Sequence, residues 1–417
     1  MTAWLEDVFI KRHGPSPVAA LPIPWVIKGA LLVFVCLIPL ESLGHDETTS
    51  SFTITRMAGV LLLASCIYRP RLILRRPELI TGLGFLLMTL ALIRTLFTEP
   101  DQLAYAFGRY VTWFQMLVFF HIATPILAQA TNRILAIYAY IAGACLTAVL
   151  LLLGLGLNVV MQEKGRTSLG NLDPNIQASV LGLAAIWLIP FLLNNRQPIR
   201  KPWFLLLLPL FTLLVSAVLL TGSRGGLIAL MAAFIPVLFT RSALPNPTAK
   251  IAILAVGLFV ITMIAFHDEG MMSRFQHSIY EGDTAGRDYL FSSSLDLWLK
   301  RPWLGWGLGA NEVALGGYTN TFYRDMHNIY LYVLTAAGVV GGGFLAGMIF
   351  RSFKTVSQTP DLMLRQVALS GLVLVLVSGS TITILFLKFF WFALACATPI
   401  VWRADKSLRP VQPFSTA

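Results

Sequence analysis

Apolar stretches of about twenty residues recur along the whole chain, and each is long enough to cross a lipid bilayer as a helix. Of the 417 residues, 56% are hydrophobic and only 12% are charged, about half the charged share of a soluble domain. The stretches are continuously apolar, whereas the strands of a membrane barrel alternate in polarity. The sequence therefore predicts an all-α polytopic integral membrane protein.

The apolar stretches predict about twelve transmembrane helices. They are residues 25–43, 52–68, 78–98, 104–127, 133–157, 175–194, 203–221, 225–240, 250–266, 327–350, 363–380 and 382–402.

The predicted organisation follows from the one long polar segment between the ninth and tenth spans. Residues 1–266 hold helices 1–9, residues 267–326 form an outer loop, residues 327–402 hold helices 10–12, and residues 403–417 are a tail. The loop is too small for a core of its own, so we expect it to pack onto the mouth of the bundle.

Lysine and arginine are concentrated in alternate connections between the spans. The positive-inside rule makes these connections cytoplasmic, which puts both termini inside and the long loop in the periplasm. The formal net charge of +11 therefore reflects orientation in the membrane, and we expect no nucleic-acid partner. The basic connections include residues 11–12, 69–76, 196–201, 241–250, 351–365 and 403–409.

Arg224 departs from this bias, because its motif TGSRGG, residues 221–226, lies in a predicted outer connection. The glycines permit a tight turn and the close approach of another group. One interpretation makes Arg224 part of an anion site, and the other makes it a turn residue that reaches the lipid headgroups.

Arg287 lies at the start of a predicted surface helix in the outer loop. Free N–H groups and the positive end of the dipole at a helix start favour an anion beside this arginine. The alternative is a solvated arginine next to Asp288. The helix itself is predicted from the spacing of Leu290, Phe291, Ser294, Leu295 and Trp298.

His327 belongs to DMHNIYLYVL, residues 325–334, where the chain enters the membrane as the tenth span. At or near the first turn of that helix, its imidazole would face the outer mouth. A histidine can take a proton near neutral pH, as the deprotonation of an attacking hydroxyl requires. In the alternative interpretation Asn328 caps the helix and His327 is an ordinary interfacial residue.

A fourth outer segment, KGRTSLGNLDPN at 164–175, brings Lys164, Arg166 and Asn175 to the same side of the membrane. Its composition is also that of a simple polar connection rich in turns.

Together these segments offer several arginines and one base at a membrane surface. Arginine binds phosphate oxygens with two parallel hydrogen bonds, so the set fits group transfer from a lipid-linked phosphate or pyrophosphate. The outer loops offer no pair of aspartates in D-x-D spacing beside a span, so we expect neither a metal nor a cofactor. Arg56, Arg109 and Lys388, near the middle of predicted spans, have no role assigned from the sequence.

The chain resembles the O-antigen ligase and polymerase superfamily of bacterial envelope glycosyltransferases. The similar pieces are TGSRGG, GRDYLFSSSLDLWLKRPWLGWGLG at 286–309 and HNIYLYVLTAAGVVGG at 327–342, with a looser likeness in GRTSLGNLDPN at 165–175. Lys300 and Arg301 stand where the family more often has a less basic residue before the proline, which adds positive charge.

The resemblance implies an inverting, metal-independent transfer of a glycan from undecaprenyl pyrophosphate at the periplasmic face of the bacterial inner membrane. It makes His327 the base that activates the acceptor hydroxyl, and it makes Arg224 and Arg287 the residues that bind the pyrophosphate. Lys164, Arg166, Asn175, Asn328, Lys300 and Arg301 are the expected further substrate-binding residues.

Within the superfamily the compact chain and its single modest outer loop favour the ligase, whose acceptor is a sugar of lipid A–core. The O-antigen polymerase and the protein O-oligosaccharyltransferase use the same donor chemistry and remain alternatives. An alternative of another class is a transporter of polysaccharide or lipid, although transporters generally place charged sites near the bilayer midplane.

Overall fold

A computed structural model of the protein describes residues 23–41, 53–97, 100–159, 165–193, 202–241, 247–267 and 286–398, with isolated positions at 162, 272, 276 and 280. This part of the chain is almost wholly helical and contains no strand, only an isolated antiparallel bridge between Leu157 and Leu169. The all-α prediction is therefore confirmed.

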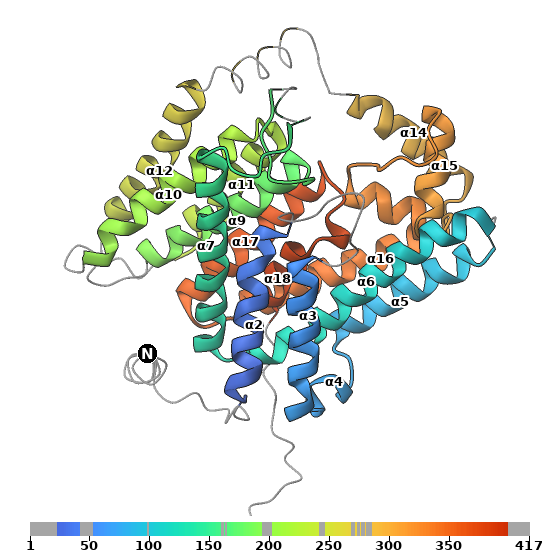
Figure 1. The fold of residues 1–417 in the computed structure, drawn as a ribbon, viewed down its shortest axis with the longest axis horizontal. Coiled ribbons are helices and arrows are strands. Elements are labelled where there is room, and N and C mark those ends of the chain that lie inside the picture. Colours follow the sequence, from blue (N-terminus) through green and yellow to red (C-terminus); the bar gives the residue numbers. More distant parts are fainter. Residues whose placement is uncertain are drawn as a thin grey trace, which may run out of the picture.

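A helix occupies each of the twelve predicted spans (Figure 1). In chain order they are α2 (Trp25–Leu37) with η1 (Ile38–Leu40), α3 (Ile54–Ser65) with η2 (Cys66–Tyr68), α5 (Leu79–Thr95), α6 (Pro100–Ile126), α7 (Ala130–Leu152), α9 (Pro174–Leu193), α10 (Pro202–Leu220), α11 (Arg224–Phe239), α12 (Pro247–His267), α16 (Ile329–Ser357), α17 (Leu362–Gly379) and α18 (Lys388–Ala397), the last preceded by η4 (Ile384–Phe386). Outside these spans lie α4 (Arg71–Leu74), α14 (Arg287–Lys300) and α15 (Ala310–Thr319).

Four of the described helices are long and apolar enough to cross a membrane, namely α7, α9, α16 and α17. Most of the others are shorter but also apolar. The structure is thus that of a multi-pass membrane protein, while twelve crossings and the four-part division of the chain stay predictions.

Helix α9 forms the centre of the bundle, where it packs against α7, α10, α11 and α17 (Figure 1). Every residue from Gln177 to Leu193 is buried, as expected for a helix that is apolar all round. Two of the polar side chains that enter this core are hydrogen-bonded to backbone carbonyls. Tyr140 of α7 donates to the carbonyl of Val180, and the indole of Trp187 donates to the carbonyl of Val367.

Helix α16 is interrupted at Gly338, whose backbone (φ 65°, ψ −163°) is open essentially to glycine alone. The break releases the carbonyls of Thr335 and Ala336 from the helix. They accept hydrogen bonds instead from the amides of Trp306 (2.8 Å) and Gly307 (2.9 Å). The LGWGLG part of the outer segment is therefore hydrogen-bonded to the backbone of α16 at its break. Through these bonds, residues 301–309 are part of the helical bundle.

A helix, α14, forms where the sequence predicts one in the outer loop. Its buried side consists of Leu290, Ser293, Ser294 and Leu297, and it packs against α15 and α16. Of the predicted apolar stripe, Leu290 and Ser294 are buried against the protein, whereas Phe291 is 50% exposed. An apolar side chain suits lipid as well as protein, so periodicity alone could not separate the two surroundings.

One of the charged residues without an assigned role forms an ion pair between the first span and the last. Lys388, the first residue of α18, is buried and forms an ion pair with Glu41 at the end of η1. The ion pair therefore links the start of the last predicted span to the end of the first.

Candidate functional site

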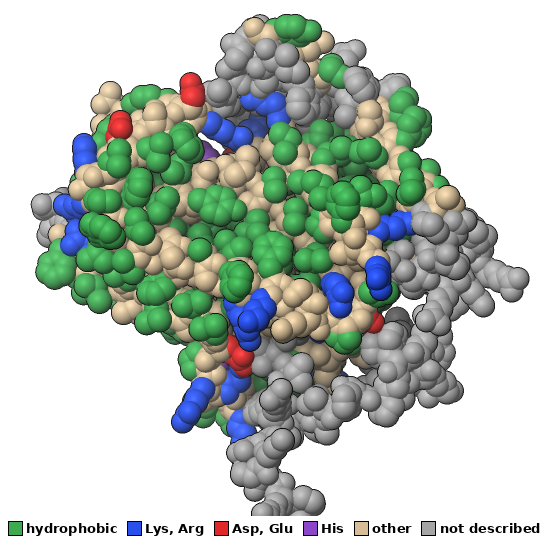
Figure 2. All heavy atoms as spheres, turned by 180° about the vertical axis from the view of Figure 1, so that it is seen from behind, with side chains coloured by type: hydrophobic (Ala, Val, Ile, Leu, Met, Phe, Trp, Pro, Cys, Tyr) green, Lys and Arg blue, Asp and Glu red, His purple; other side chains and the backbone are tan. Residues whose placement is uncertain are grey.

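Two described helices of the predicted outer loop, α14 and α15, lie on the same side of the molecule. Figure 1 shows α14 and α15 at the end opposite to α4, the helix within the basic stretch 69–76. Seen from behind, hydrophobic side chains cover the middle of the molecule, and a hollow bordered by basic side chains has a histidine at its edge (Figure 2).

The TGSRGG motif forms the turn into α11, and Arg224 is the first residue of that helix. Ser223 caps the helix by accepting a hydrogen bond from the amide of Gly226 at 3.0 Å. Gly222 has a positive φ of 61°, and a Cβ on Gly226 would overlap the Cβ of Ala178 on α9. The glycines are thus required for the turn and its packing, as predicted, and Arg224 is left half-buried.

The upstream loop meets this turn through Asn175, which is 8% exposed. Its Oδ1 accepts hydrogen bonds from the hydroxyl of Ser223 at 2.8 Å and from Nη2 of Arg166 at 3.1 Å. The structure therefore brings Arg166, Asn175 and the Arg224 turn together. Lys164 lies outside the described residues.

The turn before α16 places His327 one residue ahead of the helix cap. Asn328 is the cap, and its side chain accepts from the amides of Tyr330 (2.9 Å) and Leu331 (3.0 Å). Its Nδ2 also donates to the carbonyl of Ser380 at 3.2 Å. Asn328 thus takes the capping role that the sequence offered as an alternative, and His327 is not part of the first helical turn.

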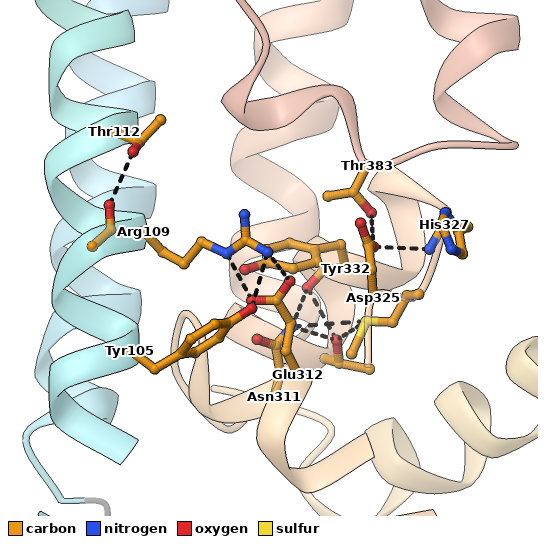
Figure 3. Close-up of polar contacts among 12 residues, drawn as sticks. Tyr105, Arg109, Thr112, Asn311, Glu312, Asp325, His327, Tyr332 and Thr383 are labelled. Atoms are coloured by element: carbon orange, nitrogen blue, oxygen red, sulfur yellow. Dashed lines mark hydrogen bonds and ion pairs between the residues drawn. The ribbon is translucent and has the colours of Figure 1, made fainter. Parts of the chain in front are cut away.

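His327 has a left-handed backbone, with φ at 50°, which is uncommon for a residue other than glycine. Asp325 holds it in this conformation (Figure 3). Its Oδ1 accepts the amide of His327 at 2.9 Å and the hydroxyl of Thr383 at 2.6 Å. Sequence reasoning missed Asp325, although an aspartate two residues ahead of a turn residue is a recognisable signal.

The connection between α17 and α18, residues 380–387, runs past three parts of the site in order. A Cβ on Gly225 would lie 2.8 Å from the hydroxyl of Thr381. Thr383 then binds Asp325 beside His327, and the ring of Phe386 lies 4.9 Å from the guanidinium carbon of Arg109. The start of α11, the His327 turn and the middle of α6 therefore lie along one short segment.

Arg109 of α6 forms an ion pair with Glu312 of α15 through two hydrogen bonds (Figure 3). Nε donates to Oε2 at 3.0 Å, and Nη2 donates to Oε1 at 2.7 Å and to the hydroxyl of Tyr105 at 3.0 Å. Glu312 has no exposed surface. Burial raises the pKa of its carboxyl, while the guanidinium of Arg109 acts in the opposite direction. The pair joins residues 203 positions apart, and no local signal in the sequence reveals it.

Arg287 is half-buried and is the first residue of α14. The hydroxyl of Tyr289, two residues on, donates to the carbonyl of Tyr318 at 2.6 Å and fastens this end of the helix to α15. Both arginines predicted to bind pyrophosphate, Arg224 and Arg287, therefore begin a helix.

Lys300 and Arg301 lie at the other end of α14, about 20 Å from Arg287 at 1.5 Å per residue. Each contacts an aromatic ring. Nζ of Lys300 lies 4.8 Å from the ring centre of Tyr318, and the guanidinium carbon of Arg301 lies 3.9 Å from that of Trp306. Burial, helped by a neighbouring arginine, lowers the pKa of Arg301. These contacts give both cations a packing role, and their substrate role stays a prediction.

Among the residues that the structure describes, no group of three or more His, Cys, Asp and Glu side chains is placed to hold a metal ion.

Residues 209–346 match a protein-family model described as O-antigen ligase. The matched range contains Arg224, Arg287 and His327. No curated protein matches the chain. The match confirms the family resemblance that the motifs carried.

Proposed function

From its place in the O-antigen ligase superfamily, we propose that this protein is an O-antigen ligase. It transfers an O-antigen glycan from undecaprenyl pyrophosphate to a sugar hydroxyl of lipid A–core, at the periplasmic face of the bacterial inner membrane. The family match and the multi-pass helical fold support this proposal. The observation that carries it is the α17–α18 connection, which touches both the turn into α11 at Gly225 and the turn that holds His327.

In this reaction His327 is the general base. Its imidazole takes the proton of the acceptor hydroxyl while the hydroxyl oxygen attacks the anomeric carbon of the donor. The bond from that carbon to the pyrophosphate oxygen breaks, and the pyrophosphate leaves with the electron pair. Attack from the face opposite the leaving group inverts the anomeric configuration.

Arg224 and Arg287 bind the pyrophosphate and stabilise it as it leaves. Each is the first residue of its helix, where the positive end of the helix dipole adds to the charge of the guanidinium. A well-placed donor to a developing anion contributes about 3 kcal/mol to transition-state stabilisation. We propose that these cations serve in place of a metal ion.

The outer-loop residues support these groups. Asn175 and Arg166 are bonded to each other and, through Ser223, to the turn that carries Arg224, so they extend the cationic side of the site. The positive-inside distribution supports an orientation with this site in the periplasm and both termini in the cytoplasm.

Reconstitution tests the proposal. The purified protein in liposomes receives an undecaprenyl-pyrophosphate glycan, together with either lipid A–core or a second molecule of the lipid-linked glycan. We expect transfer to lipid A–core, and His327→Ala protein serves as the inactive control. Elongation of the lipid-linked glycan alone would identify a polymerase instead, and the absence of transfer to either acceptor would contradict a glycosyltransferase.

A further inference from the structure

We propose that Tyr323, backed by Tyr105, is a stacking platform for a pyranose ring of one of the glycan substrates. The inference rests on the proposed function only in taking a glycan as the substrate.

The platform consists of aromatic side chains from two distant parts of the chain. The rings of Tyr105 on α6 and Tyr323 in the outer segment are stacked, with centres 4.8 Å apart and planes inclined by 26°. Phe322 stands edge-on to Tyr323, with ring centres 6.3 Å apart. Tyr323 remains 51% exposed and Phe322 62% exposed. Tyr105 covers one face of the Tyr323 ring, and half of that residue stays open to a ligand.

The backing ring is held by the buried ion pair. Arg109 donates a hydrogen bond to the hydroxyl of Tyr105 and pairs with Glu312. The backbone carbonyl of Glu312 in turn accepts the amide of Arg324 at 3.0 Å. Both residues of the stack are therefore linked to Glu312, Tyr105 through Arg109 and Tyr323 through the amide of the residue that follows it. These links limit the movement of the platform before a ligand arrives and lower the ordering cost of binding.

Exposed aromatic side chains also occur at membrane interfaces, where they anchor a protein among lipid headgroups. Such an anchor needs neither a second ring stacked behind it nor a buried ion pair to hold that ring. A flat, rigid, half-covered ring fits a flat apolar partner instead, and the C–H face of a pyranose is such a partner.

The surroundings of the platform suit the hydroxyls of a sugar. The hydroxyls of Thr319 and Thr321 lie 2.8 Å apart beside it, and that of Thr321 donates to the carbonyl of Tyr323. Arg324, the next residue in the chain, is exposed. An apolar floor with a few polar groups around it is the usual composition of a small-ligand site.

Tyr323 is also close to the reacting groups. His327 lies four positions further along the chain, so the Cα atoms of the two residues are at most about 14 Å apart. A sugar stacked on Tyr323 is therefore near the sugar whose glycosidic bond is made or broken.

Binding without catalysis tests the platform. The protein in lipid nanodiscs is titrated with two lipid-free probes, a core oligosaccharide and an O-antigen oligosaccharide, and binding is followed by saturation-transfer NMR. We expect Tyr323→Leu to weaken the binding of one probe roughly 3- to 10-fold, the loss of one ring-on-ring contact. Tyr323→Phe keeps the ring and should bind within about twofold of wild type. The weakened probe shows which substrate uses the platform.

Tyr68→Leu is the matched control, because Tyr68 is 69% exposed next to the basic stretch predicted to be cytoplasmic. The platform is refuted if Tyr323→Leu binds both probes like wild type, if Tyr68→Leu weakens binding equally, or if wild type binds neither probe. The transfer assay on wild-type protein separates the two proposals. Tyr323-dependent glycan binding by wild-type protein that transfers glycan to neither acceptor would sustain the platform and overturn the ligase.

Discussion

Substitution of Glu312 by glutamine is expected to destabilise the fold substantially while leaving the shape of the side chain nearly unchanged. The change removes the negative charge from the pair with Arg109, whose two hydrogen bonds are 3.0 and 2.7 Å long. Arg109 would then retain a cation beside a neutral amide within the bundle.

The magnitude follows from the burial of the two partners. Loss of one member of a fully buried ion pair costs about 3–5 kcal/mol, because the remaining charge is left uncompensated. Glu312 is fully buried, but the side chain of Arg109 is 31% exposed, so water can solvate part of its charge. Glutamine also keeps one acceptor for the guanidinium. We therefore expect a loss of about 2–3 kcal/mol in the free energy of unfolding.

Unfolding by SDS in mixed micelles measures this loss. Glu78→Gln is the comparison variant, since Glu78 pairs with Arg75 at 2.7 Å but its side chain is 33% exposed. Arg75 is only 11% exposed, yet it keeps its hydrogen bonds to the carbonyl of His121 and the hydroxyl of Thr124, so we expect a smaller loss of about 1–2 kcal/mol. The double variant Arg109→Met/Glu312→Leu should be more stable than Glu312→Gln, because it leaves no charge unpaired. Equal stability of Glu312→Gln and wild type would refute the reasoning.

The remaining predictions concern the reacting groups and the turn that carries one of them. His327→Ala protein should fold and lose at least about 100-fold in transfer rate, and a rate near wild type would sink its assignment as the base. Arg224→Ala and Arg287→Ala should each lower the transfer rate by about 100-fold. Lysine at either position should restore only part of the rate, because an ammonium cannot form the paired hydrogen bonds of a guanidinium. Full restoration by lysine would argue against pyrophosphate binding. Transfer should persist in EDTA, whereas loss in EDTA with recovery in Mg²⁺ would contradict the metal-independent reaction. Gly226→Ala should lower the free energy of unfolding in SDS by about 1–3 kcal/mol, because its Cβ would overlap the facing alanine of α9. The control Gly317→Ala should leave the free energy of unfolding unchanged, because nothing lies within 4 Å of the added Cβ.

The positions of the helices could be predicted because membrane insertion depends on the composition of a continuous stretch. The same holds for the TGSRGG turn, whose glycines and serine specify a tight turn and a cap locally. The grouping of Asn175 with Ser223 was reachable through topology, since both lie at the outer ends of spans.

Some features could not be predicted because they depend on contacts between distant segments. Others could not be predicted because two neighbouring residues suit the same local role equally well. Arg109 and Glu312 are paired only because α6 and α15 are neighbours in space. Asn328 and His327 could both have opened α16, and the hydrogen bonds that Asn328 accepts from the first amides of the helix identify it as the cap. Phe291 and Leu297 are both apolar, and only tertiary packing shows which one α14 buries.

The hydrogen bonding of the outer segment to α16 also has a consequence for how the protein is made. The amides of Trp306 and Gly307 leave the ribosome before the carbonyls of Thr335 and Ala336 that accept their hydrogen bonds. In the sequence, His327 lies between the two segments that these hydrogen bonds join. We therefore expect the turn that carries His327 to reach its final shape late in biogenesis, after α16 has entered the membrane. A chain halted before Gly338 would then lack the proposed site in its organised form.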